Sequence, residues 1–302
     1  MMKQKIKDFI LKTINYLKTF LKEAFVYLKT SWKSVAVIAP VCVFLYYFLG
    51  SMLTEKIDKN FNFEINKKEK GYTFIQTAAD LIKREIDDHM FTPNLPFIFP
   101  ASVLDNMPSF QKGIIESLSQ TVHVAATKLN VKELNKADAF LNYPANVWLF
   151  SKTADFKLEP SSTAQYRKSR RNLLEFNEKA QINKDVLIKV LESVEKDMAF
   201  VEQKLQKSID LHPKMKADNV FYRAQGHLYA DYLLIKSVQK DMSFDASQIL
   251  KPLEQAVSLS PQIVRNGHAG SFVPNHLFEL AYFVLKSRIS LSETIRNIKN
   301  VD

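Results

Sequence analysis

The distribution of hydrophobic and polar positions divides the chain into three parts. Residues 34–54 carry no charged side chain, whereas the arm before them and the chain after them mix apolar and polar positions. As a helix, these 21 residues would reach roughly 31 Å, which is close to the hydrocarbon thickness of a bilayer. The pattern therefore predicts a transmembrane helix over residues 34–54, with Pro40 as a point where the helix can bend.

The arm, residues 1–33, has an amphipathic pattern. Its apolar residues recur at spacings of three and four, which places them on one face of a helix. This predicts a helix that lies on a membrane surface with its lysines toward anionic headgroups. The same pattern also fits an amphipathic helix that packs on a protein partner. The lysines expected to face the membrane surface are Lys12, Lys18, Lys22, Lys29 and Lys33.

The chain beyond the span is expected to form an all-α bundle. Residues 55–70 are polar and poorly periodic, which is typical of a linker or neck. Residues 71–302 contain seven to nine segments with helical periodicity and no strand pattern of convincing length. We expect the helix at 215–242, which is apolar almost all round, to be the central one. The other helices are expected at 73–90, 109–129, 132–141, 162–179, 184–209, from Pro252, at 275–287 and from Ser290.

Particular residues indicate where some of these helices begin. Ser162 and Gln165 have the spacing of a capping box, and Asn183 is expected to cap the longest helix. A second box, Ser290-x-x-Glu293, indicates that a separate last helix begins there.

Two segments rich in proline and aromatic residues are expected to be loops. The segment 91–108 has four prolines in 18 residues, and proline both lacks an N–H donor and favours extended geometry in the residue before it. We expect Phe91, Phe97, Ile98 and Phe99 to fix this loop over the core by burial, although a peptide or ligand clasp is the alternative. The second loop is YPANVWLF, residues 143–150.

The charge distribution predicts how the chain is oriented in the membrane. Residues 1–33 hold eight lysines against Asp8 and Glu23, a net charge of +6 out of the +10 of the whole chain. The positive-inside rule therefore places the arm in the cytoplasm and the large domain on the far side of the membrane. Because the charged region is too long for a signal peptide and no cleavage site follows cleanly, we expect an uncleaved signal anchor. Cys42 is the only cysteine and lacks a lipobox before it, so neither a disulfide nor a lipid anchor is expected.

Sequence motifs for catalysis are missing. The chain contains no Gly-rich phosphate loop, GxSxG elbow or HExxH helix, and its six histidines are not spaced as paired metal ligands. A pair formed by Asp218 and Asp231 is not expected to face each other closely. The sequence therefore predicts no cofactor, no metal and no nucleic-acid partner, and favours a protein that is not an enzyme.

A cluster of arginines is the clearest candidate binding feature. Arg167, Arg170 and Arg171 lie at helical spacings that place three guanidinium groups on one face, with Tyr166 beside them. This favours recognition of an anionic group on a lipid, a polyanion or an acidic partner. The alternative is a solvated face or ion pairs with Glu175 and Glu178.

Several segments together resemble one bacterial family, catalogued as domain of unknown function 2333. The resemblance covers most of residues 71–295 and implies a single-pass inner-membrane protein of Gram-negative bacteria without an established activity. The lysine-rich arm is a departure from that family. The segments that carry the resemblance are TPNLPFIFPASVLDNMPSFQKG, YPANVWLF, SSTAQYRKSRRNLLEFN, DNVFYRAQGHLYADYLLI and SPQIVRNGHAGSFVPNHLFELAYFVLKSRISLSE.

Three functions fit these observations. The first is a non-enzymatic periplasmic scaffold that binds an envelope protein or anionic lipid through the arginine-bearing helix and the two loops. The second is a lipid- or small-ligand-binding module with a pocket between the central helix and the loops around Phe97 and Asn266. The third is an envelope hydrolase that uses Asp105, His268 or His276. The candidate loop or pocket residues are Asn94, Phe97, Asp105, Asn106, Tyr222, Arg223, Asn266 and His276.

Overall fold

The structure is a computed structural model in which the chain forms two compact units. The units are Met1–Leu53 and Thr54–Asp302. The residues it describes are 12, 15–16, 18–20, 22–23, 26, 29–66, 70–149, 158–210, 217–261, 264–265, 272–273 and 275–300.

The first unit contains the apolar helix. Helix α2 runs over Trp32–Thr54, includes Pro40 and has no buried side chain. Within the described residues, it is the one helix whose length and composition would allow it to cross a membrane. Apart from Ser31, which lies in a bend, the described residues of the arm are helical and exposed, including Lys12, Lys18 and Lys22. Most of the arm's apolar positions lie outside the described residues, so its amphipathic face stays a prediction.

The second unit is helical, as the periodicity predicts. Its central helix is α8 (Ala217–Asp241), in which sixteen residues are buried. A two-residue antiparallel ladder, β1 (Val264–Arg265) with β2 (Phe272–Val273), is an addition that the sequence did not predict. The remaining helices are α3 (Thr73–Lys83), a π-helical turn (Arg84–Asp88), two 3-10 turns (Thr92–Asn94 and Pro100–Val103), α4 (Asn106–Leu129), α5 (Lys132–Leu141), α6 (Ser162–Asn177), α7 (Lys184–Asp210), α9 (Ser247–Ser258) and α10 (Asn275–Asn300).

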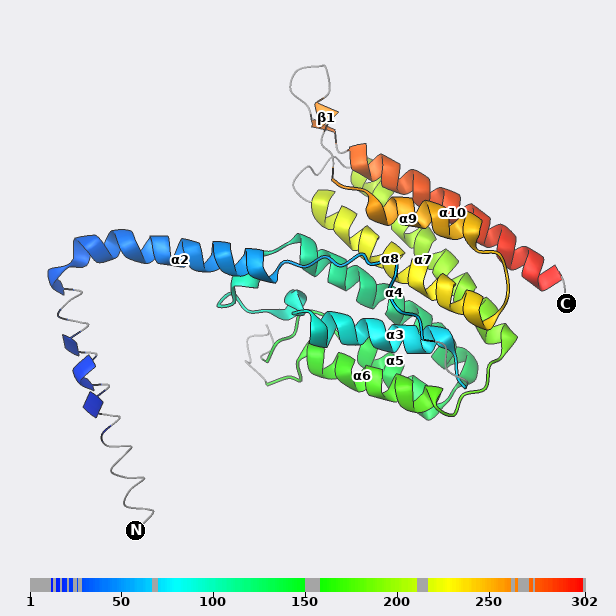
Figure 1. Ribbon diagram of the computed structural model, residues 1–302, viewed down its shortest axis with the longest axis horizontal. Helices are drawn as coiled ribbons and strands as arrows, with labels where there is room; N and C mark the ends of the chain where they lie inside the picture. The colour runs from blue at the N-terminus through cyan, green and yellow to red at the C-terminus, as the bar shows by residue number, and fades with distance from the viewer. Residues whose placement is uncertain are drawn as a thin grey trace, which may run out of the picture. The chain divides into compact units, whose positions relative to one another are not determined.

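Helices α4 and α8 pack on each other at the centre of this unit. Helices α3, α5 and α6 lie on one side of the pair, and α7, α9 and α10 lie on the other (Figure 1). The crossing is close because a glycine from each helix lies at the contact. A Cβ at Gly113 would overlap the carbonyl oxygen of Arg223, and one at Gly226 would overlap that of Phe110. The two backbones therefore approach to a distance that no larger residue would allow.

Two helices begin several residues before the predicted position. Helix α9 begins at Ser247, five residues before Pro252, because Asp245 accepts the N–H of Ser247 and Ile249 is buried. These contacts offset the loss of one backbone hydrogen bond that a proline inside a helix causes. Helix α4 begins at Asn106 rather than Ser109.

The C-terminal helix is continuous, so the prediction of two helices after residue 275 is wrong. Its buried positions Leu280, Val284, Leu291 and Ile295 keep a helical period through the expected break. The Ser290-x-x-Glu293 pattern lies inside this helix. Likewise, the cap of α6 is Ser161, whose Oγ accepts the N–H of Ala164.

Ser162, the predicted cap, has a different role. Its hydroxyl donates to the carbonyl of Pro144 at 2.7 Å, and so holds the second loop against α6. By contrast, the Asn183 cap is present, because its side chain accepts the N–H of Asp185 at 2.8 Å.

The proline-rich loop is only partly buried. Phe91 is buried, as predicted, but Phe97 and Ile98, which lie between the two 3-10 turns, are exposed. The ring of Phe99 packs edge-on against Trp148 of the second loop, with centroids 5.8 Å apart.

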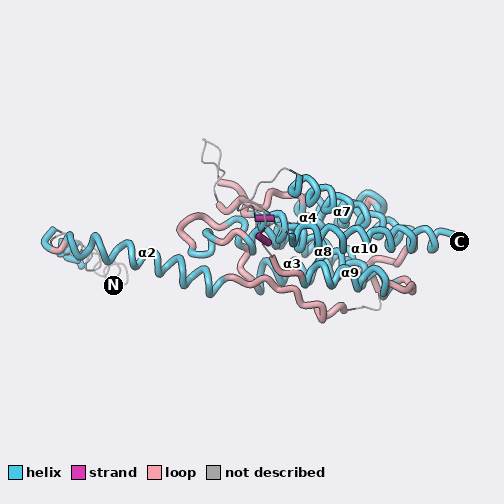
Figure 2. The backbone as a smooth tube through the Cα atoms, turned by 90° about the horizontal axis from the view of Figure 1, so that it is seen from above, coloured by secondary structure: helices cyan, strands magenta, loops and turns pink. Residues whose placement is uncertain are grey.

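Residues 55–66, which we name the strap, follow the helical bundle in extended form instead of forming a separate linker (Figure 2). Ile65 is buried, and the aromatic strap residues pack against the core. Four side chains of α8 hold the strap: Gln225 accepts from Lys59, Tyr229 donates to the Asn60 carbonyl, Lys236 donates to that of Phe61 and Lys240 donates to that of Ile65.

Candidate functional site

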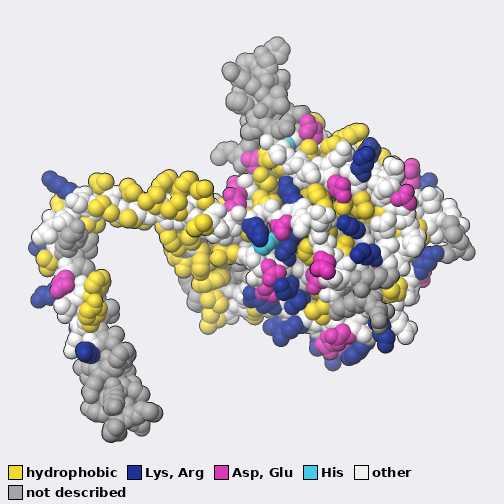
Figure 3. Space-filling view, viewed as in Figure 1, with side chains coloured by type: hydrophobic (Ala, Val, Ile, Leu, Met, Phe, Trp, Pro, Cys, Tyr) yellow, Lys and Arg dark blue, Asp and Glu magenta, His cyan; other side chains and the backbone are white. Residues whose placement is uncertain are grey.

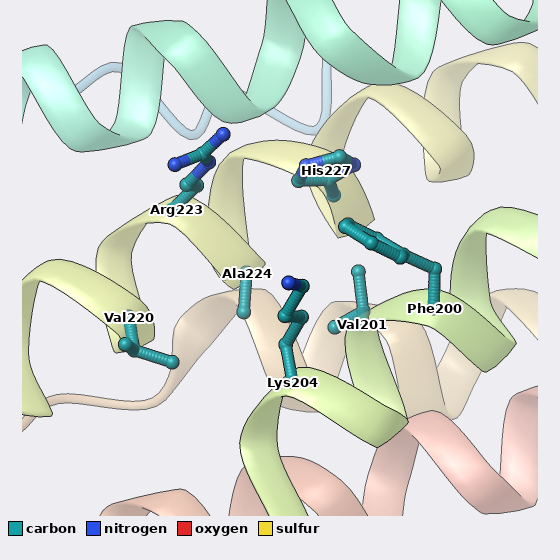
Figure 4. Close-up of a pocket in the computed structure, with 7 residues that line it drawn as sticks. All are labelled: Phe200, Val201, Lys204, Val220, Arg223, Ala224 and His227. Carbon is teal, nitrogen blue, oxygen red and sulfur yellow. The ribbon is translucent and has the colours of Figure 1, made fainter. Parts of the chain in front are cut away.

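A pocket of about 160 Å³ lies between α7 and α8 and combines apolar walls with three cationic side chains. Phe200, Val201 and Lys204 form one turn of α7, and the α8 residues follow a helical spacing that places them on one face. In Figure 4 the ring of His227 faces that of Phe200, and Arg223 points toward α4. The α8 lining residues are Val220, Arg223, Ala224 and His227.

His227 forms the inner end of this pocket and is held by two carboxylates. Its side chain is buried, with Nδ1 at 2.8 Å from Asp197 of α7 and Nε2 at 3.1 Å from Glu116 of α4. Burial alone would lower the pKa of His227, but the two carboxylates raise it to about 10. His227 is therefore an imidazolium at neutral pH, and both of its N–H groups donate to a carboxylate.

Glu116 links the imidazolium to the guanidinium of Arg223. Arg223 donates through Nε at 2.8 Å and also through Nη2. Burial would raise the pKa of Glu116, but hydrogen bonds from His227 and Arg223 lower it overall. The glycine contact between α4 and α8 explains this arrangement, because Glu116 lies one helical turn beyond Gly113 and His227 directly follows Gly226.

Asp231 extends the network into the core. It accepts a hydrogen bond from Ser117 at 2.7 Å, while Asp197 accepts one from Gln120 at 2.7 Å. Burial and the neighbouring Asp197 carboxylate raise the pKa of Asp231 well above its usual value. Lys204, Arg223 and His227 therefore give the pocket three cationic side chains, and no carboxylate is among the residues that line it.

This arrangement suits the binding of an anion better than proton transfer. A general base should have a pKa near the working pH and a free nitrogen, whereas His227 has a pKa of about 10 and both nitrogens engaged. No hydroxyl or thiol occurs among the residues that line the pocket. In the part of the chain that the structure describes, no group of three or more His, Cys, Asp or Glu is placed to hold a metal ion.

A second buried network joins the strap to the core. Arg84, in the π-helical turn, donates to Glu85 at 2.8 Å and to the Tyr229 hydroxyl at 2.7 Å, and its guanidinium lies over the ring of Phe63. Burial would lower the pKa of Arg84, but Glu85, Tyr229 and Asp58 raise it. The Arg84 charge is therefore kept and used to hold this segment in place.

The structure separates the predicted arginine cluster. Arg167 pairs with Asp87 at 2.6 Å, Arg170 donates to the carbonyl of Ala79 at 3.2 Å, and Arg171 is exposed. These partners differ from the expected Glu175 and Glu178. Tyr166 does not lie on the surface beside them, because it is buried and its hydroxyl donates to the carbonyl of Tyr143. Recognition of an anionic group by this face stays a prediction.

The predicted loop and pocket residues lie in several places. Arg223 lines the pocket between α7 and α8, and half-buried Tyr222 has Lys59 over its ring. Asn94 is buried and donates to the carbonyl of Val147, which ties the two loops together. His276 is buried edge-on against the ring of Phe221.

The others do not meet in one cleft of the described chain. Phe97 is exposed at a loop tip, and Asp105 is exposed before α4, next to Asn106. Asn266 and His268 lie outside the described residues, so a pocket between α8 and their loop is not tested.

Sequence reasoning missed His227, Asp197 and Glu116, although a signal was present. Three polar residues, Gln225, His227 and Asp231, interrupt the most apolar helix of the chain, and buried polar groups are hydrogen-bonded in folded proteins. Each of these residues therefore required a partner from another helix. The helix-interior glycine Gly226 indicated a close backbone approach at the same place.

Comparison with known proteins adds no relative. The chain matches no protein-family model, and no curated protein or solved structure is significantly similar to it. The resemblance to domain of unknown function 2333 therefore stays a prediction from the sequence segments, and the function has to be argued from the site.

Proposed function

We propose that the protein is a membrane-anchored helical binding module of the cell envelope, with an uncleaved α2 anchor, a cytoplasmic arm and a periplasmic domain. The support for the anchor is the length and apolar composition of α2. The support for the orientation is the net charge of +6 in residues 1–33 under the positive-inside rule. The resemblance to the bacterial inner-membrane family agrees with this location.

The ligand that we propose for the pocket between α7 and α8 is a small organic anion with an apolar body. The observation that carries this proposal is the combination of the apolar walls formed by Phe200, Val201 and Val220 with a lining that contains three cationic side chains and no carboxylate. The pocket volume of about 160 Å³ is close to that of an engineered cavity of about 150 Å³ that binds benzene. A single-ring or short branched carboxylate therefore fits the pocket in size and charge.

Titration calorimetry on the full-length protein in a non-ionic detergent tests this proposal. Benzoate is expected to bind with a Kd of about 0.1–1 mM, which corresponds to roughly 4–5.5 kcal/mol. The neutral isostere benzamide should bind at least tenfold more weakly, because it lacks the charge that the three cations attract. Equal binding of benzoate and benzamide would contradict the proposed charge recognition.

A matched pair of lysines provides the control. Lys204 lies over the ring of Phe200 at 5.0 Å in the pocket, and Lys168 lies over the ring of Phe140 at 5.5 Å elsewhere. Lys204→Gln should weaken benzoate binding about three- to tenfold, since an exposed charge pair contributes roughly 0.2–1 kcal/mol and a partly desolvated one more. Lys168→Gln should leave it unchanged. If both variants behave alike, benzoate does not bind in this pocket.

A second candidate function is the partner-binding scaffold, and one feature of α10 favours it. Four apolar side chains on this helix are exposed, and their spacings of four, three and four residues place them in one row. A partner with an amphipathic helix would bury this row. Loss of a co-purifying envelope protein in a Tyr282→Asp, Ile289→Asp variant would support it. The row consists of Phe278, Tyr282, Leu285 and Ile289.

A further inference from the structure

An exposed apolar surface lies on the loops that precede α4 and α6. No charged residue occurs in the 15 residues from Met90 to Leu104. The loop nevertheless exposes large apolar side chains, with exposed fractions of 79% for Phe97, 51% for Ile98 and 59% for Val103. Such a concentration marks a binding surface more often than an accident of packing.

The second loop enlarges this surface. Trp148 packs edge-on against Phe99, and the Asn94 side chain donates to the carbonyl of Val147 at 3.1 Å, so the two loops are fixed together. Leu149 is exposed beside them. Figure 3 shows hydrophobic side chains gathered at the edge of the second unit that these loops form. We name Phe97, Ile98, Val103, Trp148 and Leu149 the apolar loop surface.

Eight of the 14 residues from 91 to 104 have no unpaired backbone N–H group. Unpaired N–H groups are costly in lipid, which excludes most irregular loops from it. Three residues between 91 and 104 are prolines without an N–H group: Pro93, Pro96 and Pro100. Five others donate their N–H groups to oxygen atoms of the protein: Thr92, Leu95, Phe99, Ser102 and Leu104.

The chain enters the second unit next to the end of this loop. Helix α2 ends at Thr54, and the N–H of Lys56 contacts Met107 Sδ at 3.3 Å in the second unit. Two residues of extended chain span about 7 Å. Met107, which follows the loop by three residues, is therefore held near the point where the chain leaves α2. If α2 crosses a bilayer, the contact at Lys56 tethers Met107 within a few residues of the chain's exit from that bilayer.

We propose that the apolar loop surface inserts into the interface of the membrane that α2 crosses and so forms a second contact of the domain with lipid. Trp148, with Phe97 and Phe99, supplies the aromatic groups that favour the headgroup level. This inference rests on the proposed anchoring by α2. The inference adds to the anchoring, because a single span alone would leave the domain free to move away from the membrane surface.

Depth-dependent quenching in vesicles tests the inference. The chain has two tryptophans, so Trp32→Phe leaves Trp148 as the only tryptophan, and excitation at the red edge of absorption selects it over the tyrosines. In the full-length protein, reconstituted in phosphatidylethanolamine and phosphatidylglycerol vesicles, lipids brominated near the headgroup should quench Trp148 about twofold. Introducing Phe97→Asp and Ile98→Asp should abolish this quenching, because carboxylates oppose insertion into the interface. A Trp148 emission that brominated lipid does not change would overturn the inference.

Two controls separate this inference from the anchoring itself. Trp148→Phe leaves Trp32 at the start of α2 as the reporter of the span. If Trp32 is quenched and Trp148 is not, α2 is anchored and the loop insertion is wrong; if neither is quenched, both proposals fail. The pair Tyr282→Asp and Ile289→Asp, with exposed fractions of 59% and 49%, adds the same charge on α10 and should leave Trp148 quenched. Equal loss of quenching in both aspartate pairs would also overturn the inference.

Discussion

Replacing His227 by glutamine tests the buried ion network most directly. The side chains of His227 and Asp197 are each 2% exposed, so the substitution leaves a buried carboxylate without its cation. Removing one partner of a buried pair costs about 3–5 kcal/mol. Gln120 still donates to Asp197, and Arg223 still pairs with Glu116, so we expect the lower end of that range. At about 2–4 °C per kcal/mol, the Tm should fall by roughly 6–12 °C.

The pH dependence of the decrease in Tm tests the charge of His227 more directly than the size of the decrease does. His227 has a pKa of about 10 in the folded state, whereas the ordinary pKa of histidine is 6.5, so the folded state binds an extra proton between these values. Its stabilising contribution is therefore fully present below pH 6.5 and is lost as the pH rises through about 10. Circular dichroism melts of both proteins in a non-ionic detergent should show their Tm values converging over this range. A constant difference between pH 6.5 and pH 10 would refute the assignment of a buried imidazolium.

Two further variants control for structural damage. His123 and Asp138 form a similar pair at 2.9 Å, but the His123 side chain is 61% exposed. His123→Gln should therefore cost less than about 1 kcal/mol. Adding Asp197→Asn to His227→Gln should recover a large part of the stability, because no unpaired buried charge remains. A double variant as unstable as the sum of its parts would mean that packing, rather than charge, explains the loss.

Three other substitutions or fusions test the remaining interpretations. Gly226→Ala should destabilise the domain by about 1–3 kcal/mol in urea unfolding, because the added methyl group would overlap the Phe110 carbonyl. Helix propensity alone would instead predict a gain of stability, and such a gain would refute the close contact. Replacing Arg167, Arg170 and Arg171 together by Ala should leave the melting curve nearly unchanged but abolish co-purification of a lipid or partner, and intact pull-downs would end the recognition hypothesis. An alkaline phosphatase fused after residue 302 should be active, whereas fluorescence from a cytoplasmic reporter at the same position would reverse the proposed topology.

The periodicity of apolar residues and the capping residues predicted the helix bounds well where both signals lie within the helix itself. The bounds of α5 agree with the prediction, and those of α7 and α8 differ from it by one or two residues. Errors occurred where a local rule competed with burial: Pro252 and the Ser290 box read as helix starts, but the buried stripes of α9 and α10 continue through them. Capping groups contribute about 1 kcal/mol, which a stripe of buried side chains exceeds.

The candidate site could not be predicted in the same way, because it joins distant segments. Asp197 and Glu116 lie 30 and 111 residues from His227 along the chain. Periodicity shows which face of a helix is buried, but it does not say which helix covers that face. Gly113 and Gly226 were the only sequence signals for the pairing of α4 with α8. Glycine destabilises the interior of a helix, so its presence there indicates a place where another backbone comes close.

The strap has a mechanical consequence. Its contacts with α8 begin at Gln225 and end at Lys240, and they follow the same order along both segments, from Lys59 to Ile65. A pull on the chain from residue 54 would therefore act along the strap and load these hydrogen bonds in shear, all at once, rather than opening them one after another. Arg84, stacked on Phe63, adds a further clamp to the same segment. The domain is thus built to resist tension at the end where the membrane would hold it.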